Sequence, residues 1–203
     1  MSPRGVATPD VRERLFAAAE RVVERDGPGA LTSRAVTTEA GCAKGLLHAH
    51  FAGLDEFVAE LCLDRFARTA ERAGALAGLV GQGTPAANLG AVVHALFGPG
   101  GPAVSGLVLT RPTAAGLVRD AFAAGRPGFG AVETAVAGYL AAERDLGRIP
   151  AGRTLAPELA ALALVGTAHH LLMTGAPGAP GAPDPRAALT GLIAALVGDS
   201  TGG

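Results

Sequence analysis

The stretch TSRAVTTEAGCAKGLLHAHF, residues 32–51, predicts two short helices joined by a tight turn that contains Gly41. We expect the second helix to span residues 44–50, with Leu47 and Phe51 sharing a buried face because they are four positions apart. Two helices joined in this way form a helix-turn-helix, whose second helix can enter the major groove of DNA.

A supporting helix is predicted before this stretch. Thr8, Pro9 and Asp10 supply a capping hydroxyl, a proline at the first helical position and an acid near the positive end of the helix dipole. Apolar residues then recur every three or four positions as far as Gly27, which can end the helix. Thr32 is placed to cap the next helix, so the sequence predicts a three-helix head.

Composition restricts the class of protein. The 203 residues are 49% apolar, which is enough to bury a substantial core, and 17 basic residues nearly balance 18 acidic ones. Any contact with DNA must therefore rest on local charge. The start of the chain shows no signal-peptide pattern and there are two cysteines, from which we expect a cytoplasmic protein. Residues 155–173 are apolar, but Glu158 and two histidines interrupt them, which favours a buried helix over a membrane span.

The remainder of the chain predicts further helices and no strands, so the expected fold class is all-α. Residues 54–79 should form a long connecting helix, followed by a hinge-like boundary at residues 78–84. Later helices are expected at residues 85–97, 104–109, 113–124, 129–146, 157–173 and 185–197, with breaks at the GPGGP run of residues 98–102 and at a proline-glycine linker, residues 174–185. We predict a DNA-binding domain over residues 1–53 and a helical ligand-binding and dimerisation domain over residues 54–203.

No motif for catalysis or for a metal or cofactor is present in the sequence. His48 and His50 point in different directions on a helix, as do His169 and His170, so neither pair can share a metal ion. We expect no enzymatic activity, no metal and no cofactor. An α-helical enzyme that uses His94, His169 or His170 is the alternative.

The opening stretch resembles the N-terminal DNA-binding domain of the TetR family of bacterial transcriptional regulators. The resemblance covers residues 10–66, and the matching residues are Thr32, Arg34, Ala40, Gly41, Lys44, Gly45, Leu47, His50, Phe51, Asp55, Glu56 and Phe57. Three residues depart from the family pattern: Ala43 replaces a capping serine, His48 a tyrosine, and Leu54 a lysine that commonly meets phosphate. Eight basic and ten acidic residues up to Phe66 make the head slightly acidic.

Candidate DNA-binding residues lie on the exposed side of the two short helices. Lys44 could donate to guanine or phosphate, Leu46 could touch a thymine methyl group, and Gly45 allows close approach of the backbone. The full set is Thr32, Arg34, Lys44, Gly45, Leu46, His48 and His50, of which the threonine, the arginine and the histidines are expected to contact the sugar-phosphate chain. The alternative is that they are ordinary exposed residues.

A ligand pocket and a dimer contact are predicted in the helical body. Polar anchors on apolar helix faces are typical of pockets, and the candidates are His94, Phe97, Phe122, Phe129, Tyr139, His169 and Met173, unless they are plain core. The resemblance places the dimer contact on the last two helices, where the candidates are Leu159, Leu162, Gly166, His170, Leu189, Leu192, Ile193 and Leu196. Alternatively, both helices complete the core of a monomer.

The expected function is that of a homodimeric, ligand-responsive repressor of transcription. It would bind a palindromic operator in double-stranded DNA and be released by a small, mostly apolar effector. As the resemblance implies, the effector would tilt the connecting helix and change the separation of the recognition helices. The alternatives are a helix-turn-helix regulator without ligand control, an α-helical enzyme and a protein-interaction module.

Overall fold

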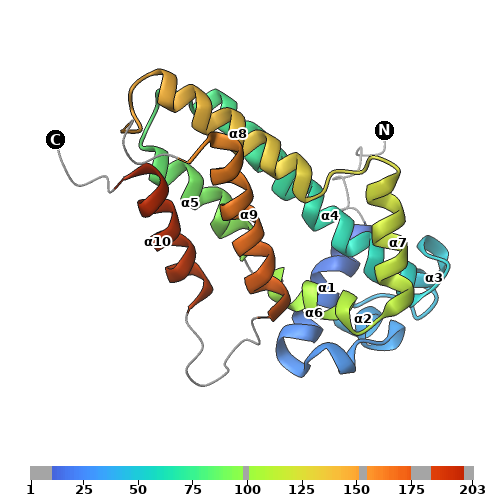
Figure 1. Ribbon diagram of the computed structural model, residues 1–203. Coiled ribbons are helices and arrows are strands. Elements are labelled where there is room, and N and C mark those ends of the chain that lie inside the picture. The colour runs from blue at the N-terminus through green and yellow to red at the C-terminus, as the bar shows by residue number, and fades with distance from the viewer. Residues whose placement is uncertain (1–10, 98–100, 151–154, 175–183, 199–203) are drawn as a thin grey trace, which may run out of the picture. The chain divides into compact units, whose positions relative to one another are not determined.

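The computed structural model describes residues 11–97, 101–150, 155–174 and 184–198, and all regular structure within these ranges is helical (Figure 1). The all-α prediction is confirmed. The predicted helix start at residues 8–10, part of the break at residues 98–102 and most of the linker at residues 174–185 lie outside the described residues. No described helix combines the length and the apolar character needed to cross a membrane.

The chain divides into two compact units. Unit 1 consists of residues 1–62 and 103–120, and unit 2 consists of residues 63–102 and 121–203. These units are defined by contacts between residues. The boundary predicted after residue 53 divides a DNA-binding domain from a ligand-binding and dimerisation domain, which contacts alone do not test, so that boundary stays a prediction.

Unit 1 contains the three-helix head. Its elements are α1 (Val11–Asp26), the 3-10 turn η1 (Pro28–Ala30), α2 (Ser33–Glu39), α3 (Leu46–His50), the start of α4 (Leu54–Gly74), and most of α6 (Gly101–Leu109) and α7 (Pro112–Ala123). Phe16 of α1, Phe51 after α3 and Phe57 of α4 form its aromatic centre, with ring centroids 5.1 to 5.9 Å apart. Leu47 and Phe51 are buried, as the helical spacing predicted. This centre places α3 against α1 and α4.

Residues 103–120 join the head although they lie far along the chain. Arg111, between α6 and α7, donates from Nη1 to Asp55 Oδ1 at 3.0 Å and from Nη2 to the carbonyl oxygen of Leu31 at 3.1 Å. Val104, Leu107 and other apolar residues of this segment are buried. Nothing in the local sequence pattern indicated this association.

Unit 2 is a helical bundle. It contains the rest of α4, the 3-10 helix η2 (Ala75–Leu79), α5 (Pro85–Leu96), α8 (Phe129–Asp145), α9 (Pro157–Thr174) and α10 (Pro185–Val197). Helix α9 packs against α8 and α10, and α10 also packs against α5 (Figure 1). The core between them draws an apolar stripe from each helix and includes Leu89, Val136, Leu164 and Ile193.

Side chains cap the starts of α5 and α10 in unit 2. Thr84 Oγ1 accepts a hydrogen bond from the amide of Ala87 at 3.2 Å, and Asp184 accepts one from the amide of Arg186 at 3.0 Å. Each cap precedes a proline, whose missing N–H costs nothing at the first helical position.

Two predicted helix boundaries outside the helix-turn-helix need correction. The connecting helix is α-helical only as far as Gly74 and continues as the 3-10 helix η2 to Leu79. Glycine is a poor helix former, and Gly74 and Gly78 both fall in this region. Helix α6 begins at Gly101 rather than at residue 104, so the GPGGP break is shorter than expected.

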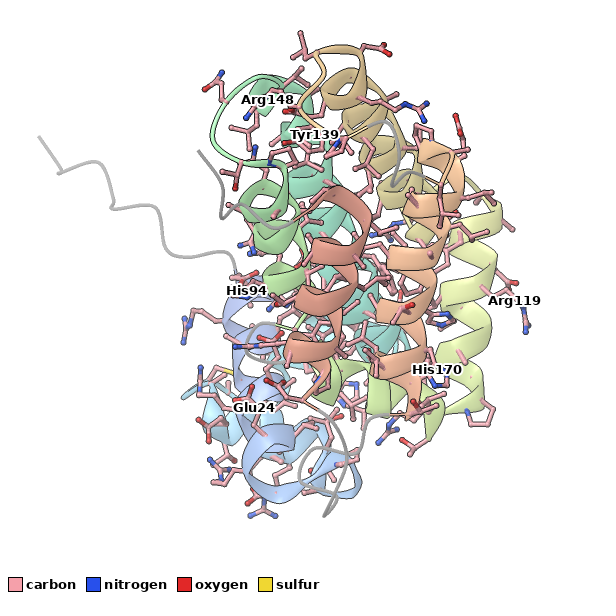
Figure 2. All side chains as sticks on the ribbon, turned by 60° about the vertical axis from the view of Figure 1, so that its left-hand side comes forward. Glu24, His94, Arg119, Tyr139, Arg148 and His170 are labelled. Carbon is pink, nitrogen blue, oxygen red and sulfur yellow. The ribbon has the colours of Figure 1, made fainter. Side chains whose placement is uncertain are left out.

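A buried polar cluster holds the turn before α5 on α8. Glu143 of α8 is fully buried; its Oε1 accepts a hydrogen bond from the amide of Gly81 at 3.0 Å, and its Oε2 lies 3.2 Å from Arg148 Nη1. Asn88 Nδ2 donates to the Tyr139 hydroxyl at 2.8 Å. Tyr139 and Arg148 lie at the same end of the bundle (Figure 2). A buried carboxylate needs such partners because its desolvation is costly.

Candidate nucleic-acid interface

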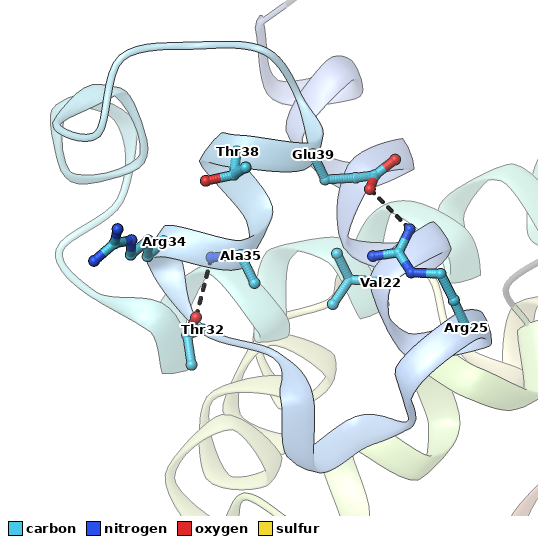
Figure 3. Close-up of a pocket in the computed structure, with 7 residues that line it drawn as sticks. All are labelled: Val22, Arg25, Thr32, Arg34, Ala35, Thr38 and Glu39. Atoms are coloured by element: carbon cyan, nitrogen blue, oxygen red, sulfur yellow. Dashed lines mark hydrogen bonds and ion pairs between the residues drawn. The ribbon is translucent and has the colours of Figure 1, made fainter.

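The start of α2 is fixed by its own side chain. Thr32 has an extended backbone, and its Oγ1 accepts a hydrogen bond from the amide of Ala35 at 3.0 Å (Figure 3). After α2 the chain reverses at Gly41, whose φ of +63° is accessible to glycine at little cost. The amide of Cys42 then donates to the carbonyl oxygen of Thr37 at 3.0 Å, which closes the turn. The predicted cap and the predicted glycine turn are both confirmed.

Helix α3 is shorter than predicted, since it begins at Leu46 instead of residue 44. Lys44 and Gly45 belong to the turn before it, in which the amide of Leu46 donates to the carbonyl oxygen of Ala43 at 2.9 Å. No side chain caps the helix at Gly45. Alanine at position 43 supplies no capping oxygen and glycine at position 45 disfavours helix, so the first turn of the expected helix is not α-helical.

The structure brings the seven candidate DNA-binding residues onto α2, the turn and α3. Leu46 is half-buried; the exposed residues are Thr32, Arg34, Lys44, Gly45, His48 and His50. Helix α3 thus buries Leu47, and His48 and His50 are exposed on either side of that buried residue. The part played by each residue in binding DNA stays a prediction.

Several arginines of the head are held by acids. Arg21 Nε lies 2.8 Å from Glu39 Oε1. Arg25 Nη1 lies 2.9 Å from Glu39 Oε2 (Figure 3). The hydrogen bond from Arg21, followed by that from Arg25, lowers the pKa of Glu39. Arg12 of α1 pairs with Glu60 of α4 at 2.8 Å. These guanidinium groups therefore link α1 to α2 and to α4.

An open hollow of about 350 Å³ lies beside α2 (Figure 3). It is lined by Val22, Arg25, Thr32, Arg34, Ala35, Thr38 and Glu39. It includes two of the candidate phosphate contacts, Thr32 and Arg34. The sequence did not indicate this hollow, because α1 and α2 form it together.

The candidate ligand residues of unit 2 do not form one group. Phe122, Phe129 and His169 belong to a chain of rings with Phe66 of α4: centroids are 5.2 Å apart for Phe66 and Phe122, 4.7 Å for Phe66 and Phe129, and 4.5 Å for Phe129 and His169. Phe66 was absent from the predicted set because it lies on the connecting helix.

The other four candidates have different surroundings. Phe97 is in the core and Tyr139 is buried beside Asn88, whereas His94 is exposed and Met173 is half-buried. Among the described residues, no three histidine, cysteine or acidic side chains are placed to hold a metal ion.

The dimer candidates on α9 and α10 differ in exposure. Leu159 and Leu162 of α9 are 54% and 53% exposed, and Gly166 and His170 are exposed as well. On α10, by contrast, the apolar stripe packs into the core of its own unit: Leu192 is half-buried, and the buried residues are Leu189, Ile193 and Leu196. These three side chains cannot contact a second copy, because they are buried in the core of unit 2.

An exposed apolar face remains on the same two helices. Leu155, just before α9, is 48% exposed and continues the line of Leu159, Leu162 and Gly166 at helical spacing. The exposed small residues of α10 are Ala187, Ala188, Gly191 and Ala195. The sequence showed that apolar residues recur every three or four positions on α9 and α10. It did not show which apolar stripe of each helix faces outward.

Comparison with known proteins agrees with this geometry. Residues 15–61 match the family model described as bacterial regulatory proteins, tetR family. No curated protein matches the sequence significantly. Among solved structures, the fatty acid degradation regulator FadR from Bacillus halodurans superposes with a TM-score of 0.64 at 15% identity, covering 97% of this chain and 99% of that one.

Two further structures have the same fold. FadR from Bacillus subtilis, solved in complex with stearoyl-CoA, has a TM-score of 0.61 at 16% identity, covering 92% of this chain and 98% of that one. A transcriptional regulator from Rhodococcus sp. Rha1 has a TM-score of 0.61 at 23% identity, with coverage of 92% and 95%.

The capped α2, the glycine turn and the exposed α3 define a protein of the helix-turn-helix class. With the family match over residues 15–61, the chain carries the N-terminal domain of the tetR family of bacterial regulatory proteins on an all-helical TetR-type fold. The family resemblance recognised in the sequence is thereby confirmed.

Proposed function

We propose that the protein is a homodimeric, DNA-binding transcriptional repressor that acts in the cytoplasm and leaves a palindromic operator when it binds a small, mostly apolar molecule. The observation that carries the proposal is the family match over a helix-turn-helix whose second helix is exposed. A five-residue helix reads few bases, so two heads on one palindrome would supply the specificity that one lacks.

Contacts with DNA would come from two elements. Thr32 and Arg34 at the start of α2 offer a hydroxyl and a guanidinium for the sugar-phosphate chain. Lys44 and Gly45, in the turn before α3, could approach the base edges or a phosphate, and Leu46 at the first position of α3 could reach a thymine methyl group.

A second copy would cover the exposed face of α9 and α10. The leucines of α9 are each about half exposed, and the small residues of α10 allow close approach of a second helix pair. The dimer contact we propose therefore consists of Leu155, Leu159, Leu162, Gly166 and His170 with Ala187, Ala188, Gly191 and Ala195.

The effector would bind among the aromatic rings of unit 2. Phe66, Phe122 and Phe129 are half-buried, and His169 adds a polar group at the end of the ring chain. An apolar site with a single polar anchor suits a small, largely uncharged molecule. A Bacillus subtilis protein of the same fold binds stearoyl-CoA, and the apolar acyl chain of that ligand supports the search for an apolar effector.

DNA binding is the experiment that tests the proposal. Operator sequences would be selected from a random duplex library and measured by fluorescence anisotropy as the salt concentration is raised. We expect a palindromic preference and an affinity that falls with salt, because neutralised phosphates release counterions. Lys44→Ala should weaken specific binding by about 1–3 kcal/mol. Arg72→Ala, which removes an exposed cation of α4 in unit 2, is the matched control and should have little effect.

The outcome separates the candidate functions. Absence of both a palindromic preference and a salt dependence would contradict the regulator. DNA binding that no bound small molecule alters would favour a helix-turn-helix regulator without ligand control. Native mass spectrometry of the purified protein would show whether an apolar molecule accompanies it.

A further inference from the structure

The α2–α3 surface carries few permanent charges. Helix α2, the following turn and α3 contain two permanently basic side chains, Arg34 and Lys44, and both are exposed. The one acid there, Glu39, forms ion pairs with Arg21 and Arg25 of α1, so its carboxylate is directed toward α1. Figure 3 shows the pair with Arg25. Any additional positive charge would therefore be a large fraction of the total on this surface.

Two exposed histidines lie on α3. His48 and His50 are two positions apart, so their imidazole rings leave the helix on different sides and flank it. Histidine is the side chain that ordinarily gains a proton between about pH 8 and pH 5. Protonation of both would double the positive charge of the surface. Their place in the last turn of α3 also suits a cation, because the helix dipole is negative at that end.

Two arginines of α1 that lie near the helix-turn-helix are already engaged. The guanidinium of Arg12 lies 4.8 Å from the centroid of the Phe51 ring and pairs with Glu60 of α4 at 2.8 Å. Arg14 donates to the carbonyl oxygen of Ala40 at 3.1 Å. Both cations are thus used to hold the head together, and neither is an alternative source of pH-dependent charge, since arginine stays protonated.

The acids at the start of α4 also have partners. Asp55 pairs with Arg111 at 3.0 Å, and Glu56 accepts a hydrogen bond from the amide of Ala52, just beyond α3. Asp55 and Glu56 are the acids nearest in sequence to His50, and each attracts an imidazolium rather than repelling it. Arg34 and Lys44, by contrast, would repel an imidazolium. A negatively charged phosphate chain that lies along the surface would attract all of these cations.

We infer that binding of DNA to this surface is coupled to the uptake of protons by His48 and His50, so that affinity for the phosphate chain rises as the pH falls from 8 to 6. The inference rests on the proposed DNA-binding function. Each imidazolium would donate an N–H to a phosphate oxygen, a contact that fixes position without reading sequence. The charge of the DNA backbone does not change over this range, so the change lies in the protein.

The test is an anisotropy titration of a labelled duplex of mixed sequence at pH 6 and at pH 8, each at several salt concentrations. Phosphate contacts are independent of sequence, so no operator is needed. We expect binding to be about 10-fold tighter or more at pH 6 at low salt. Each phosphate neutralised steepens the log-log salt slope by about 0.9, so four imidazoliums in a dimer would steepen it by about 3.6.

Two double variants assign the effect to these residues. His48→Gln with His50→Gln should have the same affinity at pH 6 as at pH 8, whatever the level of that affinity, because glutamine takes up no proton. His48→Lys with His50→Lys should bind tightly at both pH values, because lysine stays charged. Both sites are exposed, so the variants should fold, which circular dichroism would verify. The other three histidines lie in unit 2 and are retained in every variant.

The possible results separate the two ideas. Equal affinity and equal salt slope at both pH values in the parent would overturn the inference and leave DNA binding intact. A pH dependence that persists in the glutamine variant would also overturn it. If the parent binds the duplex at neither pH, the proposed function itself fails.

Discussion

Arg111 Nη1 lies 3.0 Å from Asp55 Oδ1, an ion pair between residues 56 positions apart. The same guanidinium donates from Nη2 to the carbonyl oxygen of Leu31 at 3.1 Å. Asp55 is in the first turn of α4, and Leu31 immediately precedes Thr32, the cap of α2. The Arg111 side chain, in the connection between α6 and α7, therefore links the N-terminal ends of α2 and α4.

Replacing Arg111 should destabilise unit 1. Arg111→Ala removes a charge-assisted hydrogen bond and leaves the Leu31 carbonyl without this donor, at an expected cost of about 1–2 kcal/mol. Urea denaturation would measure the loss. Arg119→Ala, at an exposed site on α7, is the control and should stay within about 0.5 kcal/mol of the parent. An Arg111→Ala protein as stable as the parent would show that the contact has no energetic weight.

A serine at position 43 should stabilise the head. The amide of Leu46 already donates to the carbonyl oxygen of residue 43, so the serine hydroxyl would accept a hydrogen bond from the amide of Gly45, two residues on, as Asp184 does from Arg186. Caps of this kind contribute about 0.5–2 kcal/mol. The same denaturation experiment on Ala43→Ser would reveal the gain, with Ala43→Val as a substitution that adds bulk without a capping oxygen. No gain would mean that the turn before α3 cannot adopt capped geometry.

A charge on the exposed leucines of α9 should separate the proposed dimer. Leu162→Glu would bury a carboxylate in an apolar contact without a partner, which is strongly unfavourable. Leu146→Glu is the matched control, because Leu146 is 57% exposed but follows α8. Analytical ultracentrifugation should find a dimer for the parent and the control, and a monomer for Leu162→Glu. A dimer in all three proteins would place the contact elsewhere.

Tyr139 should ionise at unusually high pH. Burial raises its pKa, the hydrogen bond from Asn88 opposes this, and the hydrogen bond with Glu143 adds to it. The chain has one tyrosine and no tryptophan, so ultraviolet absorbance of the phenolate reports this residue alone. The folded protein should show a midpoint above the value of about 10 for free tyrosine, and denaturant should restore that value. A midpoint at or below about 10 in the folded state would contradict the burial argument.

The raised pKa of Tyr139 also makes the stability of the protein depend on pH. The pKa of Tyr139 is higher in the folded state than in the unfolded state, so its contribution is complete below the unfolded value of about 10. It is lost as the pH rises through the folded value. Tyr139→Phe should therefore lose less stability than the parent between neutral and strongly alkaline pH.

The two cysteines should differ in reactivity. Burial raises the pKa of the Cys62 thiol to about 12, whereas Cys42 is half-buried. Since the thiolate is the reactive form, Ellman's reagent should modify one thiol readily in the folded protein and the second only after denaturation. Cys42→Ser should abolish the readily modified thiol. Ready modification of that variant would indicate that α4 opens in the folded state.

The local sequence was sufficient to predict much of the three-helix head and most helix boundaries. The caps at Thr32, Thr84 and Asp184 act on amides two or three residues away, so their residue types and spacing could be recognised directly. The same holds for the turn at Gly41 and for the burial of Leu47 and Phe51, which follow from backbone conformation and helical period. The candidate DNA-binding residues lie in this stretch, which is why the structure places them together.

Local chemistry did not reveal contacts between distant segments. The outward face of α9 and the inward face of α10 both consist of apolar residues at helical spacing, and only their neighbours in the folded bundle distinguish them. Arg111 similarly carries no mark of its partner Asp55, since ion pairs form wherever packing brings opposite charges together. Helical periodicity depends on residues within one or two turns, whereas the choice of partner depends on the packing of the whole unit.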